Sequence, residues 1–170
     1  MLLHNLTFFD CRSLRSFAFS GAAVLQPPHS GATKDATVEV TVTVTNTGKV
    51  ASAVTAQVYC SYLDTPQLRV VRWAAMLCGF TKIFLAPQEQ QLARVPVALS
   101  ALARWDTRAA ATDLLGRAVA GAYVVDAGRY GVAVGDCSGA AAAAGYAAPR
   151  PCAQQRAQFS VNRTLVFAGK

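Results

Sequence analysis

The sequence predicts an all-β fold, a sandwich of two antiparallel sheets, on three observations. Apolar and polar residues alternate with a period of two in several short runs, which is typical of strands with one buried and one wet face. Glycine, proline, asparagine and aspartate separate these runs at intervals of about ten residues. The chain has 170 residues and is 53% hydrophobic, enough for one core, and no run reaches the roughly 18 apolar residues of a membrane span.

The clearest strand signal lies in residues 37–61. Four valines occupy alternate positions between 38 and 44, with glutamate and threonine between them. Asn46–Thr47–Gly48 then supplies residues that tolerate positive φ, and a second alternating run covers residues 54–60. Two such runs around an Asn-x-Gly turn predict a β-hairpin within one antiparallel sheet.

The N-terminal 35 residues carry four aromatics but no sustained period. We interpret residues 1–35 as an irregular segment with a linker at Pro27–Gly31, followed by one domain over residues 36–170. The aromatics are expected on an edge strand, or packed against a neighbour that the sequence does not contain, rather than in a site.

The middle of the chain contains an apolar run, Val70–Leu85, that Gly79 interrupts. A glycine in such a run predicts a bulge or a close approach of two backbones. Ala86–Glu89 is expected to be a turn because Pro87 presets φ. Pro96 confines the next strand, Gln91–Leu99, to a sheet edge or a bulge.

The C-terminal half reads as short elements with an insertion. We expect a helical turn at 100–106 capped by Ser100, a loop at 107–117, a hairpin of 123–125 with 129–134, and a last strand at 158–167. The alanine-rich residues 138–151 form a flexible insertion in this interpretation. Short strands with frequent turns are typical of an immunoglobulin/fibronectin type III-like antiparallel β-sandwich.

The net charge of +7 raises the question of a nucleic-acid partner. A nucleic-acid surface needs clustered arginines and lysines, whereas here they are scattered singly along the expected strands and turns. We therefore expect neither a nucleic acid nor a membrane as a partner. Asp10, Arg12 and Arg15 interrupt the apolar start of the chain, so the sequence does not open with a clean signal peptide.

Five cysteines leave at least one without an intrachain partner. No CxxC pair is present, and His4 and His29 lie outside the patterned region, so no metal site is expected. Cys137 and Cys152 flank the alanine-rich insertion, and a disulfide between them would tie its ends together. The alternative is that both are free buried thiols in a reducing compartment.

No catalytic residue and no cofactor are predicted. Retaining glycosidases need two carboxylates about 5 Å apart, and nothing in the sequence brings two of the nine acids together, Asp106 and Asp126 included. A cysteine or serine nucleophile would need a histidine base. Trp73 and Trp105 could stack on a sugar ring, but we favour core or domain-interface packing for each, with Trp105 closing the end of the sandwich.

Several of these segments together resemble a known family. The series VTVTVTNTGKVASAVTAQVY, CGFTKIFLAPQE, Val95–Leu99 with LARWD behind it, and DAGRYGVAVGD resembles the fibronectin type III-like domain that ends glycoside hydrolase family 3 enzymes, the β-glucosidases and β-xylosidases. The resemblance covers residues 37 to 137. It excludes the first 35 residues and the insertion, and Gln88 replaces a glycine that is usual in the family.

The resemblance implies a non-catalytic accessory domain from a longer, truncated hydrolase chain. The family's catalytic domains lie upstream of this module, so no catalytic residue is carried over, and the expected partners are those domains in cis. Family members are often secreted or bound to the cell wall. The alternative is a free-standing module that binds a polysaccharide or a protein, because one sandwich fold serves many functions.

Overall fold

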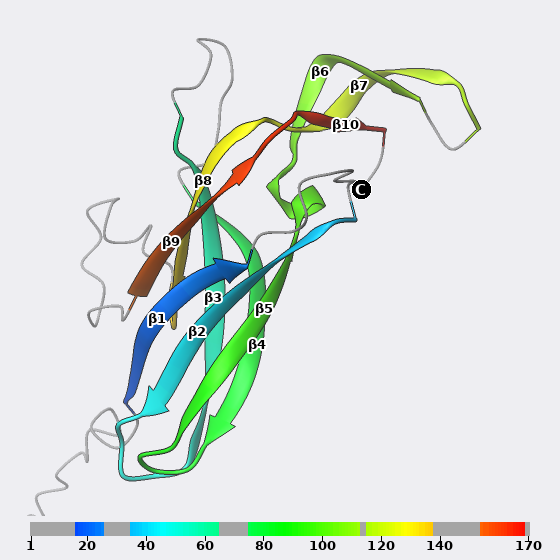
Figure 1. Cartoon of the computed structure of the whole chain (residues 1–170). Coiled ribbons are helices and arrows are strands. Elements are labelled where there is room, and N and C mark those ends of the chain that lie inside the picture. Colours follow the sequence, from blue (N-terminus) through cyan, green and yellow to red (C-terminus); the bar gives the residue numbers. More distant parts are fainter. Residues whose placement is uncertain (1–15, 26–34, 65–74, 113–114, 138–153, 169–170) are drawn as a thin grey trace, which may run out of the picture.

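The computed structural model describes residues 16–25, 35–64, 75–112, 115–137 and 154–168, and it contains three antiparallel sheets (Figure 1). Their strand orders are β1-β2-β5, β4-β3-β8-β9 and β10-β7-β6. The strands are β1 (Phe17–Leu25), β2 (Thr37–Asn46), β3 (Ser52–Tyr62), β4 (Met76–Leu85), β5 (Gln90–Ala98), β6 (Arg104–Thr112), β7 (Ala118–Val125), β8 (Gly128–Gly135), β9 (Gln154–Val161) and β10 (Leu165–Phe167). The all-β prediction is confirmed.

The first two sheets form the sandwich, and their inward side chains make one core. The valine row of β2 is fully buried, with Val38, Val40, Val42 and Val44 all at 0% exposure. Val58 on β3 and Val134 on β8 belong to the same core from the opposite sheet, also at 0%. Each fully buried valine stabilises the fold by about 1.5 kcal/mol or more, so this row is a main source of stability.

The expected hairpin of residues 37–61 is wrong, because its two strands lie in different sheets. β2 pairs with β1 and β5, whereas β3 pairs with β4 and β8. Both strands have an apolar face, and in a sandwich these faces bury each other across the core instead of lying side by side. Alternation therefore identified both strands correctly and could not identify their partners.

Asn46 holds the corner where the chain passes from one sheet to the other. Its side-chain amide donates to the carbonyl oxygens of Val50 and Leu85, both at 3.0 Å, and its Oδ1 accepts from Gly48 N–H at 2.9 Å. Its backbone carbonyl accepts from Gln88 N–H at 2.9 Å. The β2–β3 corner and the β4–β5 turn are thus joined through one residue.

Gly79 and Pro96 occupy the positions that the sequence predicts. The register of β3 with β4 shifts beside Gly79, which is a bulge, and a Cβ on Gly79 would lie only 3.0 Å from the carbonyl oxygen of Pro96. Both alternatives stated for Gly79 therefore hold. Pro96 lies on β5, an edge strand, where its missing N–H breaks no ladder.

The third sheet is the part of the fold that sequence patterning missed. Residues 107–112 continue β6 and are not a loop, and β7 and β8 lie in different sheets instead of forming a hairpin. The expected strand at 158–167 is divided between β9 and β10. Strand β6 contains no buried residue, so it lacks the apolar alternation that marks a buried face.

Two smaller predictions are also corrected. The helical turn is a 3-10 turn at Leu99–Leu102 with no side-chain cap, so Ser100 does not cap it, and Arg104 to Asp106 are already strand. Residues 1–35 are not irregular throughout, because Phe17–Leu25 form edge strand β1. The edge-strand interpretation of the aromatics is confirmed for Phe17 and Phe19. The insertion at 138–151 lies outside the described residues. In the part described, no helix has the length and apolarity to cross a membrane.

Candidate functional site

An aromatic row crosses the third sheet, one residue from each strand. Trp105 on β6 is in register with Tyr123 on β7, which is in register with Phe167 on β10. The Trp105 and Tyr123 rings meet edge to face with centroids 5.0 Å apart, and Tyr123 stacks on Phe167 at 6.0 Å. The ring contacts place the three side chains on one face of the sheet. Figure 1 shows this small sheet extending beyond the two main sheets.

Trp105 does not close the end of the sandwich, because 51% of it is exposed. Its indole lies over Gly121, where an added Cβ would overlap the six-membered ring, and Gly121 has φ +81°. Strand alternation places Arg104 on the face opposite Trp105, which leaves the indole outward. Core packing is thus wrong for Trp105, while interface packing and sugar stacking stay predictions. Trp73 lies outside the described residues.

The opposite face of the third sheet carries an ion-pair cluster centred on Arg104. The guanidinium donates to Asp126 at 2.8 and 3.2 Å and to Asp106 at 2.7 Å. These hydrogen bonds raise the pKa of Arg104, and the largest contribution is the hydrogen bond that Arg104 donates to Asp126. The Arg104 contact and the Arg108 N–H lower the pKa of Asp106. Two acids that the sequence left apart are therefore brought to one cation.

This cluster is unsuited to glycoside hydrolysis. A retaining enzyme needs one carboxyl with a raised pKa to donate a proton, and the pKa of Asp106 moves in the opposite direction. The sequence signal for the Arg104–Asp106 ion pair was their spacing of two residues, because residues two apart on a strand lie on the same face. Asp126 comes from a separate strand end, which only the fold brings close.

The outward side of edge strand β4 exposes three large apolar residues. Leu77, Phe80 and Phe84 are 48%, 65% and 68% exposed, with the cation of Lys82 between the two phenylalanines. We name Leu77, Phe80 and Phe84 the β4 apolar face. Exposed apolar side chains that share one face of a strand often mark a surface that contacts another protein or domain.

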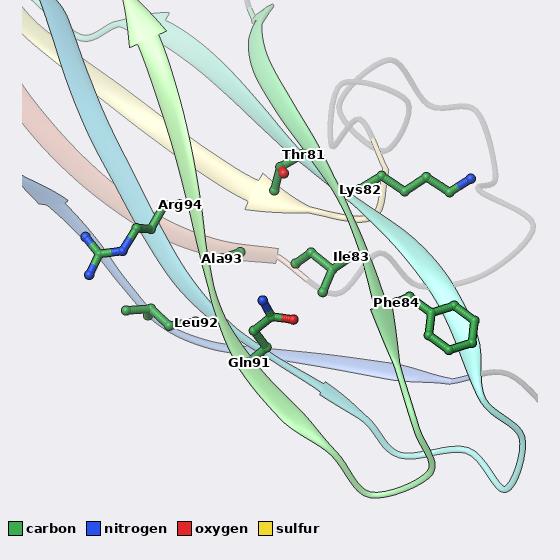
Figure 2. Close-up of a pocket in the computed structure, with 8 residues that line it drawn as sticks. All are labelled: Thr81, Lys82, Ile83, Phe84, Gln91, Leu92, Ala93 and Arg94. Carbon is green, nitrogen blue, oxygen red and sulfur yellow. The ribbon is translucent and has the colours of Figure 1, made fainter.

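A groove of about 420 Å³ separates β4 from β5, the edge strands of the two main sheets. Figure 2 shows Lys82 and Phe84 pointing away from β5, and Leu92 and Arg94 pointing away from β4. Thr81, Ile83, Gln91 and Ala93 lie between the strands. A ligand site combines an apolar pocket with convergent polar or titratable side chains. In this groove Thr81 and Gln91 are the polar side chains that lie between the strands. We therefore interpret the groove as the junction between the two sheets.

The cysteines divide into two kinds. Cys137 is disulfide-bonded, whereas Cys60 and Cys78 are buried thiols outside any disulfide. Cys152 lies outside the described residues, so its pairing with Cys137 stays a prediction. No group of three or more histidine, cysteine, aspartate or glutamate side chains able to hold a metal ion occurs among the residues that the structure describes.

Comparison with known proteins supplies the family context. The model of the fibronectin type III-like domain matches residues 54–138, half of the chain. A protein from Emericella nidulans described as probable β-glucosidase N is 30% identical over 99 residues, which are 58% of this chain and 12% of that protein.

Solved structures agree in fold. A family 3 β-glucosidase from Bifidobacterium adolescentis superposes with a TM-score of 0.59 at 27% identity, over 87% of this chain and 17% of that one. A β-glucosidase from Kluyveromyces marxianus gives 0.61 at 25% identity, over 90% and 15%. The chain thus spans a small part of each relative. The sandwich, its strand order and the matched half of the sequence together show that this chain belongs to the fibronectin type III-like domain family.

Proposed function

We propose that this chain acts as a non-catalytic accessory module of a family 3-type glycoside hydrolase and packs in cis against the catalytic domains of a longer chain. The relatives support this proposal, because the match covers only 12% to 17% of the β-glucosidases described above. A module of this size within a larger enzyme needs a surface that holds it against its neighbours.

The β4 apolar face is the observation that carries the proposal. Its phenylalanines are exposed on the outside of the sandwich, where burial against a neighbouring domain would remove them from water. Each would contribute roughly 1.5–3 kcal/mol if fully buried. Interfaces between domains of one chain are assembled from such patches with a polar rim, and Lys82 supplies a charge within this one.

The docking test uses the catalytic part of a family 3 β-glucosidase expressed without its own fibronectin type III-like domain. The purified chain should bind it and raise its melting temperature. The variant Phe80→Ser with Phe84→Ser should lose most of that effect, while Leu25→Ser, at an exposed apolar residue on a different edge strand, should keep it. Equal stabilisation by all three chains would contradict this surface.

The absence of catalysis is tested separately. The purified chain should not hydrolyse aryl-β-glucosides or aryl-β-xylosides above the buffer rate. Hydrolysis requires a carboxyl group with a raised pKa as proton donor, whereas the pKa of Asp106 is lowered. Turnover that disappears when one acid is replaced, for instance in Asp106→Asn, would overturn the proposal. Turnover that survives every such replacement would identify a contaminant.

A second candidate function is carbohydrate binding by a free-standing module, and the aromatic row favours it. Trp105 is half exposed, with its six-membered ring against Gly121, so part of the indole is accessible to a sugar ring. Retardation in a polysaccharide affinity gel that Trp105→Ala abolishes and Phe84→Ala does not would support this function. Unchanged migration of the wild-type chain across a panel of β-glucans and xylans would eliminate it for those polymers.

A further inference from the structure

The two buried thiols of the described residues lie on neighbouring strands of the sheet β4-β3-β8-β9. Cys60 is on β3 and Cys78 on β4, and these strands are hydrogen-bonded neighbours. Cys60 is in register with Met76, and the bulge beside Gly79 shifts the register at this point. Both side chains face the core, with 3% and 9% exposure.

The two thiols are in contact. A side-chain hydrogen bond joins Cys60 to Cys78, and Cys78 Sγ also donates to the carbonyl oxygen of Met76 at 3.3 Å. This contact and burial raise the pKa of the Cys60 thiol. Thiolate is the species that attacks a disulfide, so the pair should react slowly while the sheet is closed.

We propose that Cys60 and Cys78 form a covalent modification site, a cross-strand disulfide that ties edge strand β4 to β3. The oxidant is a small-molecule disulfide such as oxidised glutathione. One cysteine thiolate attacks it and releases one thiol, and the second cysteine then displaces the other thiol from the mixed disulfide. Two electrons and two protons leave the cysteine pair, and the oxidant is reduced to two thiols.

The fold shields the two thiols from oxidants and also allows them to become exposed when β4 separates from the sheet. The side chains lie in the core, but β4 is the outermost strand of its sheet, and edge elements open locally at lower cost than central ones. Cys137 is disulfide-bonded, so its bond provides a reference within the same chain. The proposal concerns stability and is independent of the proposed docking role.

The experiment reduces the folded chain fully, removes the reductant and adds oxidised glutathione. Incubation continues beyond the point at which the thiol of Cys137 is consumed, until no further thiol is lost, so that the disulfide of Cys137 is an internal positive control. Free thiols are then alkylated under denaturing conditions. Trypsin cleaves after Arg69 and Arg72, which lie between the two cysteines in the sequence, so a Cys60–Cys78 bond appears as a linked peptide pair by mass spectrometry.

The expected result is that linked pair, formed more slowly than the bond at Cys137 and faster in urea below the unfolding transition. Recovery of both cysteines as alkylated thiols at the end of the incubation overturns the proposal, as does either cysteine still linked at that point to glutathione or to a third cysteine. A thermal readout gives an independent check. The wild type should gain roughly 6 to 12 °C more on oxidation than Cys78→Ala, the size expected for closing a short loop. Equal gains would also overturn it.

Discussion

At the scale of single residues, polar groups that the core encloses decide the local geometry. Asn46 has no exposed surface, yet its side chain satisfies two carbonyls and one N–H of the surrounding backbone. Buried backbone groups without partners are costly. An asparagine at this corner therefore does what water would do at an exposed turn.

Asn46→Ala should destabilise the chain by about 3 kcal/mol, because it leaves buried backbone groups without partners. Urea unfolding followed by circular dichroism measures this change. Thr47→Ala is the matched control at the adjacent, exposed position, and it should change the free energy of unfolding by roughly 0.5 kcal/mol or less. Similar losses in both variants would show that the corner does not depend on the Asn46 side chain.

Gln88 is the one non-glycine residue with positive φ in the described part of the chain, at +64°. It is the third residue of the Ala86–Glu89 turn, closed by the hydrogen bond from Glu89 N–H to the carbonyl oxygen of Ala86 at 3.1 Å. A residue with a Cβ destabilises the fold by about 1–2 kcal/mol in this left-handed conformation. Glycine avoids that strain, but its greater backbone entropy in the unfolded chain offsets about half of the gain in stability. The glycine usual in the family suits the backbone better.

Gln88→Gly should therefore stabilise the chain by roughly 0.5–1 kcal/mol. Gln88→Ala is the control, because it keeps the Cβ that causes the strain and should give no gain. The midpoint of urea unfolding distinguishes them. A stabilised alanine variant, or a destabilised glycine variant, would contradict strain at this turn.

At the scale of elements, two ion-pair clusters join strand ends to loops. Arg104 links β6 to Asp126, the residue after β7. Asp64, which follows β3, accepts from the Arg129 backbone N–H and from its Nε, both at 2.7 Å. These contacts, the backbone bond first, lower the pKa of Asp64 below 3.8. Because the side chains of Asp64 and Asp106 are partly exposed to solvent, we expect their ion pairs to affect the pH dependence of stability rather than to stabilise the fold strongly.

The stability of the chain should fall as the pH drops through the acid range. A carboxyl whose pKa is lower in the folded state stabilises fully above its unfolded value, 3.8 here, and this contribution is lost as pH falls through the folded value. Unfolding free energies from about pH 6 to about pH 2 measure the slope. Asp64→Asn should flatten it below the unfolded value, and Asp35→Asn serves as the exposed control. An unchanged slope in Asp64→Asn would refute the assignment.

At the scale of the whole molecule, the chain is a well-packed sandwich with a small exposed sheet and an apolar edge. The core draws buried residues from both main sheets, so the apolar face of β4 is not needed to fold it. Beyond the bulge at Gly79, residues of β4 alternate between the core side and the solvent side: Ile83 is 7% exposed, while Phe84 beside it is 68% exposed. One strand therefore serves the core on one side and a neighbour on the other.

Phe80→Ser with Phe84→Ser should reduce binding of a hydrophobic dye and concentration-dependent self-association of the isolated chain. Its free energy of unfolding should change by roughly 0.5 kcal/mol or less per position. Ile83→Ser on the inner side should instead destabilise by about 3 kcal/mol. Sedimentation and thermal unfolding separate the two effects. Loss of stability in the double variant would mean that the face belongs to the core.

The sequence by itself determined the all-β class, the valine row, the bulge at Gly79 and the edge position of Pro96. Each of these follows from local chemistry, since side-chain period, a missing Cβ and a missing N–H act within one strand and its immediate neighbours. The sequence also showed that Gln88 replaces a glycine usual in the family, but only the structure showed the positive φ at this position.

Only the tertiary structure decided which strands pair and which charges meet. The two strands of residues 37–61 lie in opposite sheets because their apolar faces bury each other. Asp106 and Asp126 share Arg104, and Cys60 touches Cys78, through contacts between separate strands. Strand β6 with Trp105 contains no buried residue, so no hydrophobic period could reveal it. Pairing is set by long-range burial, which a local pattern does not encode.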